Sequence, residues 1–295
     1  MRKILLALAA LAVMAVASAF TAAGSSAPAS ASAIPGCAKA ALNLVGDGTL
    51  TVGTDNPAYP PWFGGGTPYK GSSWKINDPN TAKGFESAVA YAVAQQLGFT
   101  RSQVKWLYTP FSRSFAPGPK SFDFDINQIS YTPARAKVVT FSASYYNVNQ
   151  AIVVVKGTKI ASVRSIRGLK PYKLGAQLGT TSYQYIVNRI RPSSRPAVFP
   201  KNDAAVQALK NKQIDGLVVD LPTAFYVTAV QVPNGKILGQ FPTTAGGEHF
   251  GMVFQKGNSL AVCVNKALAN LKRSGALGKI QQTWLAKATG APVLR

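Results

Sequence analysis

Residues 126–146, INQISYTPARAKVVTFSASYY, decide how this chain is interpreted. The stretch begins like the end of a buried strand, breaks at Pro133, and places Arg135 just past the break, near Ser130 and Thr132. A second β-rich run follows. A guanidinium at the carboxyl end of a core strand suits a ligand carboxylate, which arginine holds in bidentate fashion. A lone arginine at such a position is more often a solvated surface residue, and only its combination with polar groups elsewhere in the chain favours a binding role.

Strand-like and helix-like segments alternate on both sides of this stretch, which predicts parallel β-structure in an α/β protein. The chain passes from a first α/β unit to a second near residue 147 and returns near residue 247. We therefore expect two α/β lobes joined by a two-stranded hinge, with a cleft between them. The expected bounds are residues 34–147 plus 247–295 for lobe one and 148–246 for lobe two. The expected strands are 50–54, 104–108, 124–130, 151–155, 173–178, 216–220 and 250–254; the expected helices include 85–97, 182–190, 203–211, 260–271 and 277–285.

The amino terminus has the pattern of a secretory signal. Arg2 and Lys3 precede an apolar run, and small residues with A-x-A patterns follow it. Residues 1–33 are expected to be a signal peptide and a low-complexity cleavage region, so that the mature protein is exported to the periplasm, cell envelope or extracellular space. Cys37 and Cys263 both remain after cleavage. An even count in an exported chain favours a disulfide; two free thiols, or a lipid anchor at Cys37, are the alternatives.

The charge is strongly positive. The chain has 32 Lys and Arg against 10 Asp and Glu, a net charge of +22, and loss of Arg2 and Lys3 leaves +20. The basic residues are scattered and form no nucleic-acid motif, so we expect no nucleic-acid partner. An anionic envelope is the partner that this charge favours.

Polar and aromatic residues collect at the predicted ends of strands in both lobes. An arginine can hold a carboxylate, a carboxylate can hold an ammonium, and an aromatic ring can cover a side chain or a cation. Together they predict a cleft for a small zwitterion. The alternatives are helix N-caps at Thr180, Thr181 and Asp220, and core packing of the aromatic rings. The candidates are Asp55, Tyr59, Trp62, Phe111, Ser130, Arg135, Thr181 and Asp220.

Several motifs, in order, resemble the polar amino-acid-binding group (family 3) of extracellular solute-binding proteins of ABC importers. They are GTLTVGTDNPAYPPW (48–62), GFESAVAYAVAQQLG (84–98), ISYTPARAKVVTFSASYY (129–146), LGAQLGTTSYQYI (174–186), IDGLVVD (214–220) and KALANLKRSGALGKIQQTWL (266–285). The resemblance implies a Venus-flytrap fold of the type II periplasmic-binding-protein kind. It also implies a monomer without enzymatic activity, cofactor or metal, which captures an amino acid and delivers it to a membrane permease.

The resemblance also implies roles for individual residues. Arg135, Ser130 and Thr181 are expected to hold the α-carboxylate, and Asp220 and Gln128 the α-ammonium. The chain departs from the family pattern at four places: Glu86 stands for an aspartate, Pro133 and Ala134 replace polar residues, a loop at 111–119 replaces a helix, and Gln128 replaces a small hydroxyl residue.

Two other functions are compatible with the sequence. The first is a cyclohexadienyl-dehydratase-like enzyme acting on a small carboxylate, on the same scaffold. Histidine is the usual general acid or base, and the one histidine, His249 beside Glu248, is not part of a catalytic triad, a Cys-His pair or a metal cluster. The second is a basic cell-envelope protein that binds polyanions through its net charge.

Overall fold

The computed structural model describes residues 34–66, 70–243, 246–288 and 290–295. The expected signal segment, residues 1–33, lies outside the described residues. Among the residues that are described, no helix is both long enough and apolar enough to cross a membrane.

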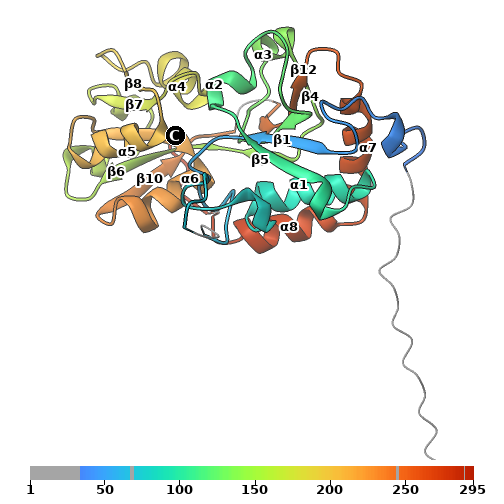
Figure 1. The fold of residues 1–295 in the computed structure, drawn as a ribbon. Coiled ribbons are helices and arrows are strands. Elements are labelled where there is room, and N and C mark those ends of the chain that lie inside the picture. The colour runs from blue at the N-terminus through green and yellow to red at the C-terminus, as the bar shows by residue number, and fades with distance from the viewer. Residues whose placement is uncertain (1–33, 67–69, 244–245, 289) are drawn as a thin grey trace, which may run out of the picture. The chain divides into compact units, whose positions relative to one another are not determined.

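The first lobe is built on a five-stranded sheet (Figure 1). Its strand order is β2 (Val104–Tyr108), β1 (Leu50–Thr54), β3 (Phe124–Asp125), β12 (Val253–Gln255) and β4 (Val139–Phe141). β1 pairs in parallel with β2 and β3, whereas β12 runs antiparallel to β3 and β4. The carboxyl ends of β1, β2 and β3 therefore meet at one edge.

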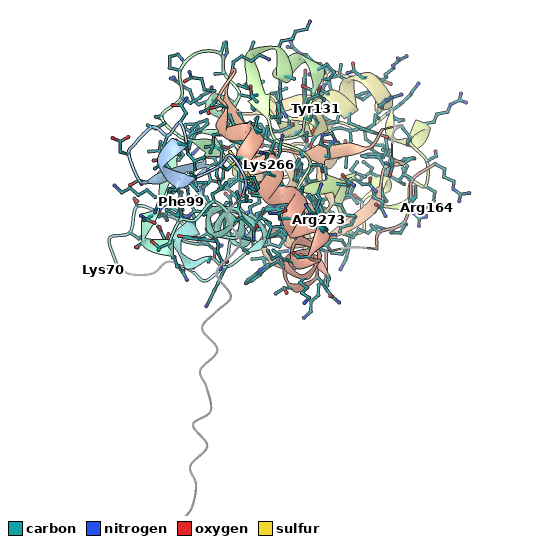
Figure 2. All side chains as sticks on the ribbon, turned by 90° about the vertical axis from the view of Figure 1, so that its right-hand side faces the viewer. Lys70, Phe99, Tyr131, Arg164, Lys266 and Arg273 are labelled. Carbon is teal, nitrogen blue, oxygen red and sulfur yellow. A yellow bond between two sulfur atoms is a disulfide. The ribbon has the colours of Figure 1, made fainter. Side chains whose placement is uncertain are left out.

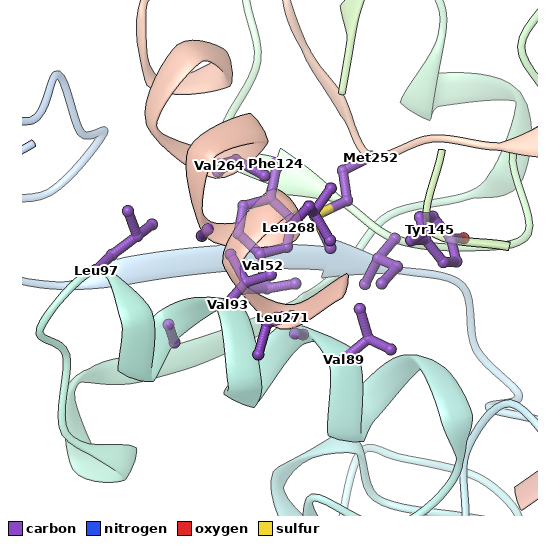
Figure 3. Packing of buried hydrophobic residues seen from close by; sticks show 14 of the residues in the cluster. Val52, Val89, Val93, Leu97, Phe124, Tyr145, Met252, Val264, Leu268 and Leu271 are labelled. Carbon is purple, nitrogen blue, oxygen red and sulfur yellow. The ribbon is translucent and has the colours of Figure 1, made fainter. Parts of the chain in front are cut away.

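Three helices form the core of this lobe with the sheet: α1 (Phe85–Gln96), α7 (Leu260–Arg273) and α8 (Ala276–Leu285). Apolar residues at helical spacing on α1 and α7 face the strands. Figure 3 shows Val89 and Val93 of α1, and Leu268 of α7, close to Val52 of β1 and Phe124 of β3. A disulfide joins Cys37 to Cys263 on α7, as expected, with an S–S distance of 2.05 Å.

The second lobe has its own five-stranded sheet. Its order is β10 (Gly235–Gln240), β6 (Gln150–Val155), β9 (Gly216–Asp220), β7 (Leu174–Gln177) and β8 (Ala197–Phe199). Alternate residues of the strands enter two separate apolar clusters, one on each face. One face is covered by α5 (Asn202–Lys210), α6 (Leu221–Tyr226) and the π-helical turn η7 (Val227–Gln231). The other face is covered by the short turns η4 (Lys159–Ser162) and η5 (Arg167–Leu169) and the π-helical turn η6 (Ile186–Ile190), which continues α4 (Thr181–Tyr185).

A two-stranded antiparallel ribbon connects the lobes. It consists of β5 (Tyr146–Val148) and β11 (Glu248–Phe250), where the chain crosses between the two sheets. The last residues do not stay with lobe one, however. Val293 bridges to Gln240 of β10, and Leu294 enters the second lobe's core.

The region around Arg135 differs from the expected strand, break and strand. Only Phe124–Asp125 of the expected strand is regular, and residues 133–138 form a short helix, α3 (Pro133–Val138). The side chain of Thr132 caps this helix by accepting from the N–H of Arg135 at 3.1 Å, and Pro133 occupies the first turn, where its missing N–H costs nothing. Thr132 and Pro133 therefore determine where the helix begins. The loop that replaces a family helix contains one short turn, α2 (Phe111–Ser114), and the remaining 3-10 turns are η1 (Lys39–Ala41), η2 (Pro79–Thr81) and η3 (Arg101–Gln103).

Candidate ligand-binding cleft

A cleft lies between the carboxyl ends of strands from the two sheets. Its lining includes all of the residues singled out from the sequence: Asp55, Tyr59, Trp62, Phe111, Gln128, Ser130, Arg135, Thr181 and Asp220. Further lining residues that the sequence did not single out include Asn127, Gln177, Lys201, Asn202 and Thr223.

The side chain of Arg135 is held in place by groups of the protein itself. Its two terminal nitrogens donate to the carbonyl oxygens of Ser130 and Gly179, each at 2.7 Å. The ring of Phe115 lies 4.2 Å from the guanidinium carbon, and that of Phe111 lies 5.7 Å away, both within cation–π range. Burial lowers the pKa of Arg135 to about 10, so the side chain stays charged at neutral pH. It is a pre-oriented cation at the cleft, with only 9% of its surface exposed.

Glu248 is the central residue that sequence reasoning did not place in the site. It projects from hinge strand β11, and its Oε1 accepts from the hydroxyls of Ser130 and Thr181, each at 2.5 Å. The side-chain amide of Gln150 donates to both Glu248 oxygens at 3.2 Å. Gln150 in turn accepts from the hydroxyl of Ser182 at 2.6 Å. The two hydroxyls expected to hold a ligand carboxylate therefore already have a carboxylate partner within the protein.

Asp220 ends β9 and stands at the N-cap position of α6, but its side chain makes no cap hydrogen bond. Its Oδ1 instead accepts from the amide of Gln150 at 2.6 Å. Burial, and then the nearby charge of Glu248, raise the pKa of Asp220 well above its usual range, and the bond from Gln150 opposes this in part. Gln150 thus lies between two carboxylates, which is how one neutral side chain holds both of them at the cleft.

The helix-cap alternative applies to Thr180 rather than to Thr181. The hydroxyl of Thr180 accepts from the N–H of Tyr183 at 3.1 Å and caps α4. That arrangement leaves the hydroxyl of Thr181 to reach Glu248 and to lie 3.2 Å from the hydroxyl of Ser130.

The aromatic residues divide between core and cleft. Trp62 is buried among rings of the first lobe, such as Phe85 at 6.1 Å, yet its indole N–H donates to Thr223 of the second lobe at 3.1 Å. Tyr59 lies 6.1 Å from Tyr226 of the second lobe, measured between ring centroids. Together with the bond from Arg135 to Gly179, and the bonds of Ser130 and Thr181 to the same oxygen of Glu248, these contacts join the lobes across the cleft.

Gln128, which the resemblance assigned to the ligand ammonium, lines the cleft but is bonded to Glu86. Its side-chain amide and its backbone N–H both donate to Glu86, the latter at 2.7 Å, and the hydroxyl of Tyr145 donates to the same carboxylate. Burial raises the pKa of Glu86 to about 7. Two departures from the family pattern, Glu86 and Gln128, are therefore partners of each other.

Two further groups complete the account of the site. Asp55 accepts from the N–H of Asn56 at 2.7 Å, and burial raises its pKa, while the charge of Lys201 opposes the rise. His249, by contrast, stacks on Tyr131 with 5.4 Å between the ring centroids and does not line the cleft.

Comparisons with known proteins agree with this geometry. The family model of bacterial extracellular solute-binding proteins, family 3, matches residues 50–287. The chain belongs to this family, and its two lobes and hinge form the type II periplasmic-binding-protein-like fold. It is a solute-binding protein.

Individual relatives are similar to the chain over most of its length. The ABC transporter glutamine-binding protein GlnH of Bacillus subtilis (strain 168) is 28% identical over 215 residues, which cover 71% of this chain and 76% of that protein. A probable histidine-binding protein of Neisseria gonorrhoeae is 26% identical over 223 residues, 73% of this chain and 79% of that protein. Among solved structures, an ancestral arginine-binding protein bound to glutamine superimposes with a TM-score of 0.65 and 34% identity, covering 80% of this chain and 97% of that one.

Proposed function

We propose that this protein captures an amino acid between its lobes and delivers it to a membrane permease of an ABC importer. The observation that carries the proposal is the placement of Arg135 and Asp220 in the lining of a single interlobe cleft, with a second carboxylate, Glu248, bonded to the lining residues Ser130 and Thr181. Relatives named for binding glutamine, histidine and arginine support an amino acid as the ligand.

Arg135 is the proposed partner of the ligand carboxylate. A guanidinium has five N–H donors in a planar fork. Two of them are used by the carbonyl oxygens of Ser130 and Gly179, so three are left for a ligand. The rings of Phe111 and Phe115 hold the plane of the fork, which reduces the entropy lost when the ligand binds.

Asp220 and Glu248 are the proposed partners of the ligand ammonium. Both are acceptors when ionised, and they share the amide of Gln150. Burial, and then the charge of Glu248, raise the pKa of Asp220, and an ammonium placed between the two carboxylates offsets the second of these effects. Ser130 and Thr181 keep a place in the proposed site, but as acceptors towards this ammonium, because their protons are donated to Glu248.

The rest of the lining is proposed to receive the ligand side chain. Asp55, Lys201 and Asn202 supply charged and polar groups, with Tyr59 and Trp62 beside them. This mixture fits a polar side chain better than an aliphatic one, because an aliphatic side chain would leave these groups desolvated without partners.

A thermal-shift screen of amino acids, with their deaminated and decarboxylated analogues, tests the proposal. Ligand at about 100 times its dissociation constant stabilises the folded state by about 2.7 kcal/mol. Small-angle scattering of the same samples should show a smaller radius of gyration with ligand, and a monomer throughout. If no amino acid raises the unfolding temperature, or if an analogue without its amine is as effective as the parent ligand, the proposed function is wrong.

A further inference from the structure

The acidic and basic residues of this protein are distributed very differently. All ten acidic residues lie in the described part of the chain, and only Asp47, Asp203 and Asp215 among them are exposed. The others are buried in the core or half-buried at the cleft. The outer surface of a chain with 32 Lys and Arg therefore carries almost no compensating negative charge.

The excess of basic over acidic residues is greatest in one continuous segment of the second lobe. Residues 156–202 contain no acidic residue, and each Lys and Arg in the segment is exposed. They are Lys156, Lys159, Arg164, Arg167, Lys170, Lys173, Arg189, Arg191, Arg195 and Lys201. A solvated surface needs no such segregation, because interspersed charges of both signs give solubility with less self-repulsion.

The fold brings most of these cations to one face. Ile160 of η4, Leu169 of η5 and Ile186 of η6 all pack into the same apolar cluster, on one side of the second sheet. Their exposed neighbours must then face solvent on that side. The N–H of Ser193 donates to the carbonyl of Lys170 at 2.8 Å, which ties the loop after η6 to the end of η5. We define the cationic face as Lys159, Arg164, Arg167, Lys170, Arg191 and Arg195.

The exposed acids lie away from this face. Asp203 belongs to α5, which packs on the opposite side of the second sheet, and Asp47 precedes β1 in the first lobe. Asp215 lies in the loop before β9, where it accepts from the N–H of Lys173 at 2.8 Å. The cationic face therefore has no acidic side chain among its own elements.

We propose that the cationic face binds reversibly to a bilayer surface that carries anionic headgroups. Lys and Arg side chains are attracted to such a surface without inserting into it. Binding of single-stranded nucleic acid, in contrast, relies on exposed aromatic rings for stacking. The large exposed hydrophobic side chains of the second lobe within the described residues are aliphatic: Leu178, Val187, Val198 and Val230. A broad face made from separate turns also suits a planar surface better than a linear polymer. The proposal does not depend on which ligand the cleft holds.

Vesicle co-sedimentation with two charge-matched variants tests the proposal. The face variant replaces Arg164, Arg167, Lys170 and Arg191 with Gln. The control variant replaces the exposed residues Lys272, Arg273, Lys279 and Lys287, on and after α7 and α8, with Gln. Figure 2 labels Arg164 and Arg273, one residue from each set. Both variants lose the same net charge, so only the place of the loss differs.

The parent protein should bind vesicles of phosphatidylcholine mixed with phosphatidylglycerol, and rising salt concentration should dissociate it from them. It should not bind vesicles of phosphatidylcholine alone. The face variant should bind the mixed vesicles roughly 600-fold more weakly, because it lacks four basic residues and each one contributes about a fivefold factor near an anionic surface. The control should stay within about threefold of the parent. Equal losses in both variants would show that net charge alone acts, and no loss in either would show that the face is not used. Either result overturns the proposal. So does a face variant that loses binding to soluble polyphosphate but not to vesicles. Unfolding temperatures with and without cleft ligand establish that both variants are folded.

Discussion

Replacing Glu248 with Gln tests how the cleft distinguishes an ammonium from a carboxylate. Oε1 of Glu248 accepts from the hydroxyls of Ser130 and Thr181 at 2.5 Å each. A hydroxyl has a single proton, so a hydroxyl that donates to Glu248 offers only lone pairs to a ligand. Those lone pairs suit an N–H donor and repel a carboxylate oxygen. Glu248 therefore determines that two hydroxyls, one on each lobe, face the ligand as hydrogen-bond acceptors and not as donors.

The expected size of the effect follows from the loss of charge. A glutamine keeps one acceptor oxygen for the two hydroxyls but removes the negative charge near the ligand ammonium. Hydrogen bonds to charged groups contribute about 1.5–3 kcal/mol, and neutral ones about 0.5–1.5 kcal/mol. The difference of about 1–2 kcal/mol corresponds to binding that is about 5- to 30-fold weaker. The new amide nitrogen would also face the donor nitrogen of Gln150, now 3.2 Å from both Glu248 oxygens, and this adds to the loss.

Titration calorimetry with the amino acid found in the screen is the assay, and the deaminated analogue provides the second arm. Glu248→Gln should weaken the amino acid by the stated factor and change the deaminated analogue by less than about threefold. Asp47→Asn is the matched control, since Asp47 is an exposed acid outside the cleft lining. Tighter binding of the amino acid by Glu248→Gln would refute the reasoning. It would mean that Glu248 competes with the ligand carboxylate for the hydroxyls.

Other predictions concern the remaining charges and the core. Arg135→Ala and Asp220→Ala should each weaken amino-acid binding in calorimetry by about 2–5 kcal/mol, because a ligand charge is left desolvated without a partner. Arg135→Lys should also bind the amino acid poorly, since an ammonium lacks the planar fork of a guanidinium. Near-parental affinity in these variants would exclude the proposed roles of Arg135 and Asp220. The pKa of Glu86 rises from 4.5 to about 7 on folding. Between these two pH values the folded state binds more protons than the unfolded state, so the free energy of unfolding should fall by about 3 kcal/mol as pH rises from the lower value to the higher. Urea titrations at the two pH values should show a smaller fall in Glu86→Gln than in the parent protein. An equal fall in both proteins would assign the pH dependence to other groups. Replacing Cys37 and Cys263 with Ser should lower the free energy of unfolding by about 5 kcal/mol, because the disulfide spans a sequence separation of 226; chemical denaturation with intact-mass analysis checks this, and unchanged stability would show that the crosslink does not restrict the unfolded chain.

Much of the fold and part of the cleft lining follow from local sequence patterns. Strand ends carry ligand groups in α/β lobes, so Arg135, Thr181 and Asp220 could be placed near one another without coordinates. Thr132 and Pro133 could also have predicted the helix that carries Arg135, since a capping residue followed by proline is a helix start. The sequence interpretation instead treated Pro133 only as the end of a strand.

Glu248 and Gln150 could not be found in this way, because their importance depends on tertiary structure alone. Glu248 begins hinge strand β11 and Gln150 begins β6 of the second sheet, and a polar residue at the start of a strand gives no local sign of a site. Their side chains meet at the cleft only because β11 and β6 approach each other beneath it, with the two residues 98 positions apart in the chain. The pairing of Gln128 with Glu86 is hidden for the same reason, at a separation of 42.

The position of Glu248 on the hinge connects ligand recognition to lobe closure. Ser130 belongs to the first lobe and Thr181 to the second, and Oε1 of Glu248 bonds to both. A rotation about the hinge ribbon separates these two hydroxyls, so a single oxygen can hold both only while the lobes touch. Asp220 moves with Thr181, because both belong to the second lobe. The acceptor set proposed for a ligand ammonium is therefore complete only in the closed arrangement, and a ligand that uses it stabilises that arrangement by its differential affinity. A carboxylate held by Arg135 adds to the same bias, because the fork of Arg135 also reaches Gly179 across the cleft.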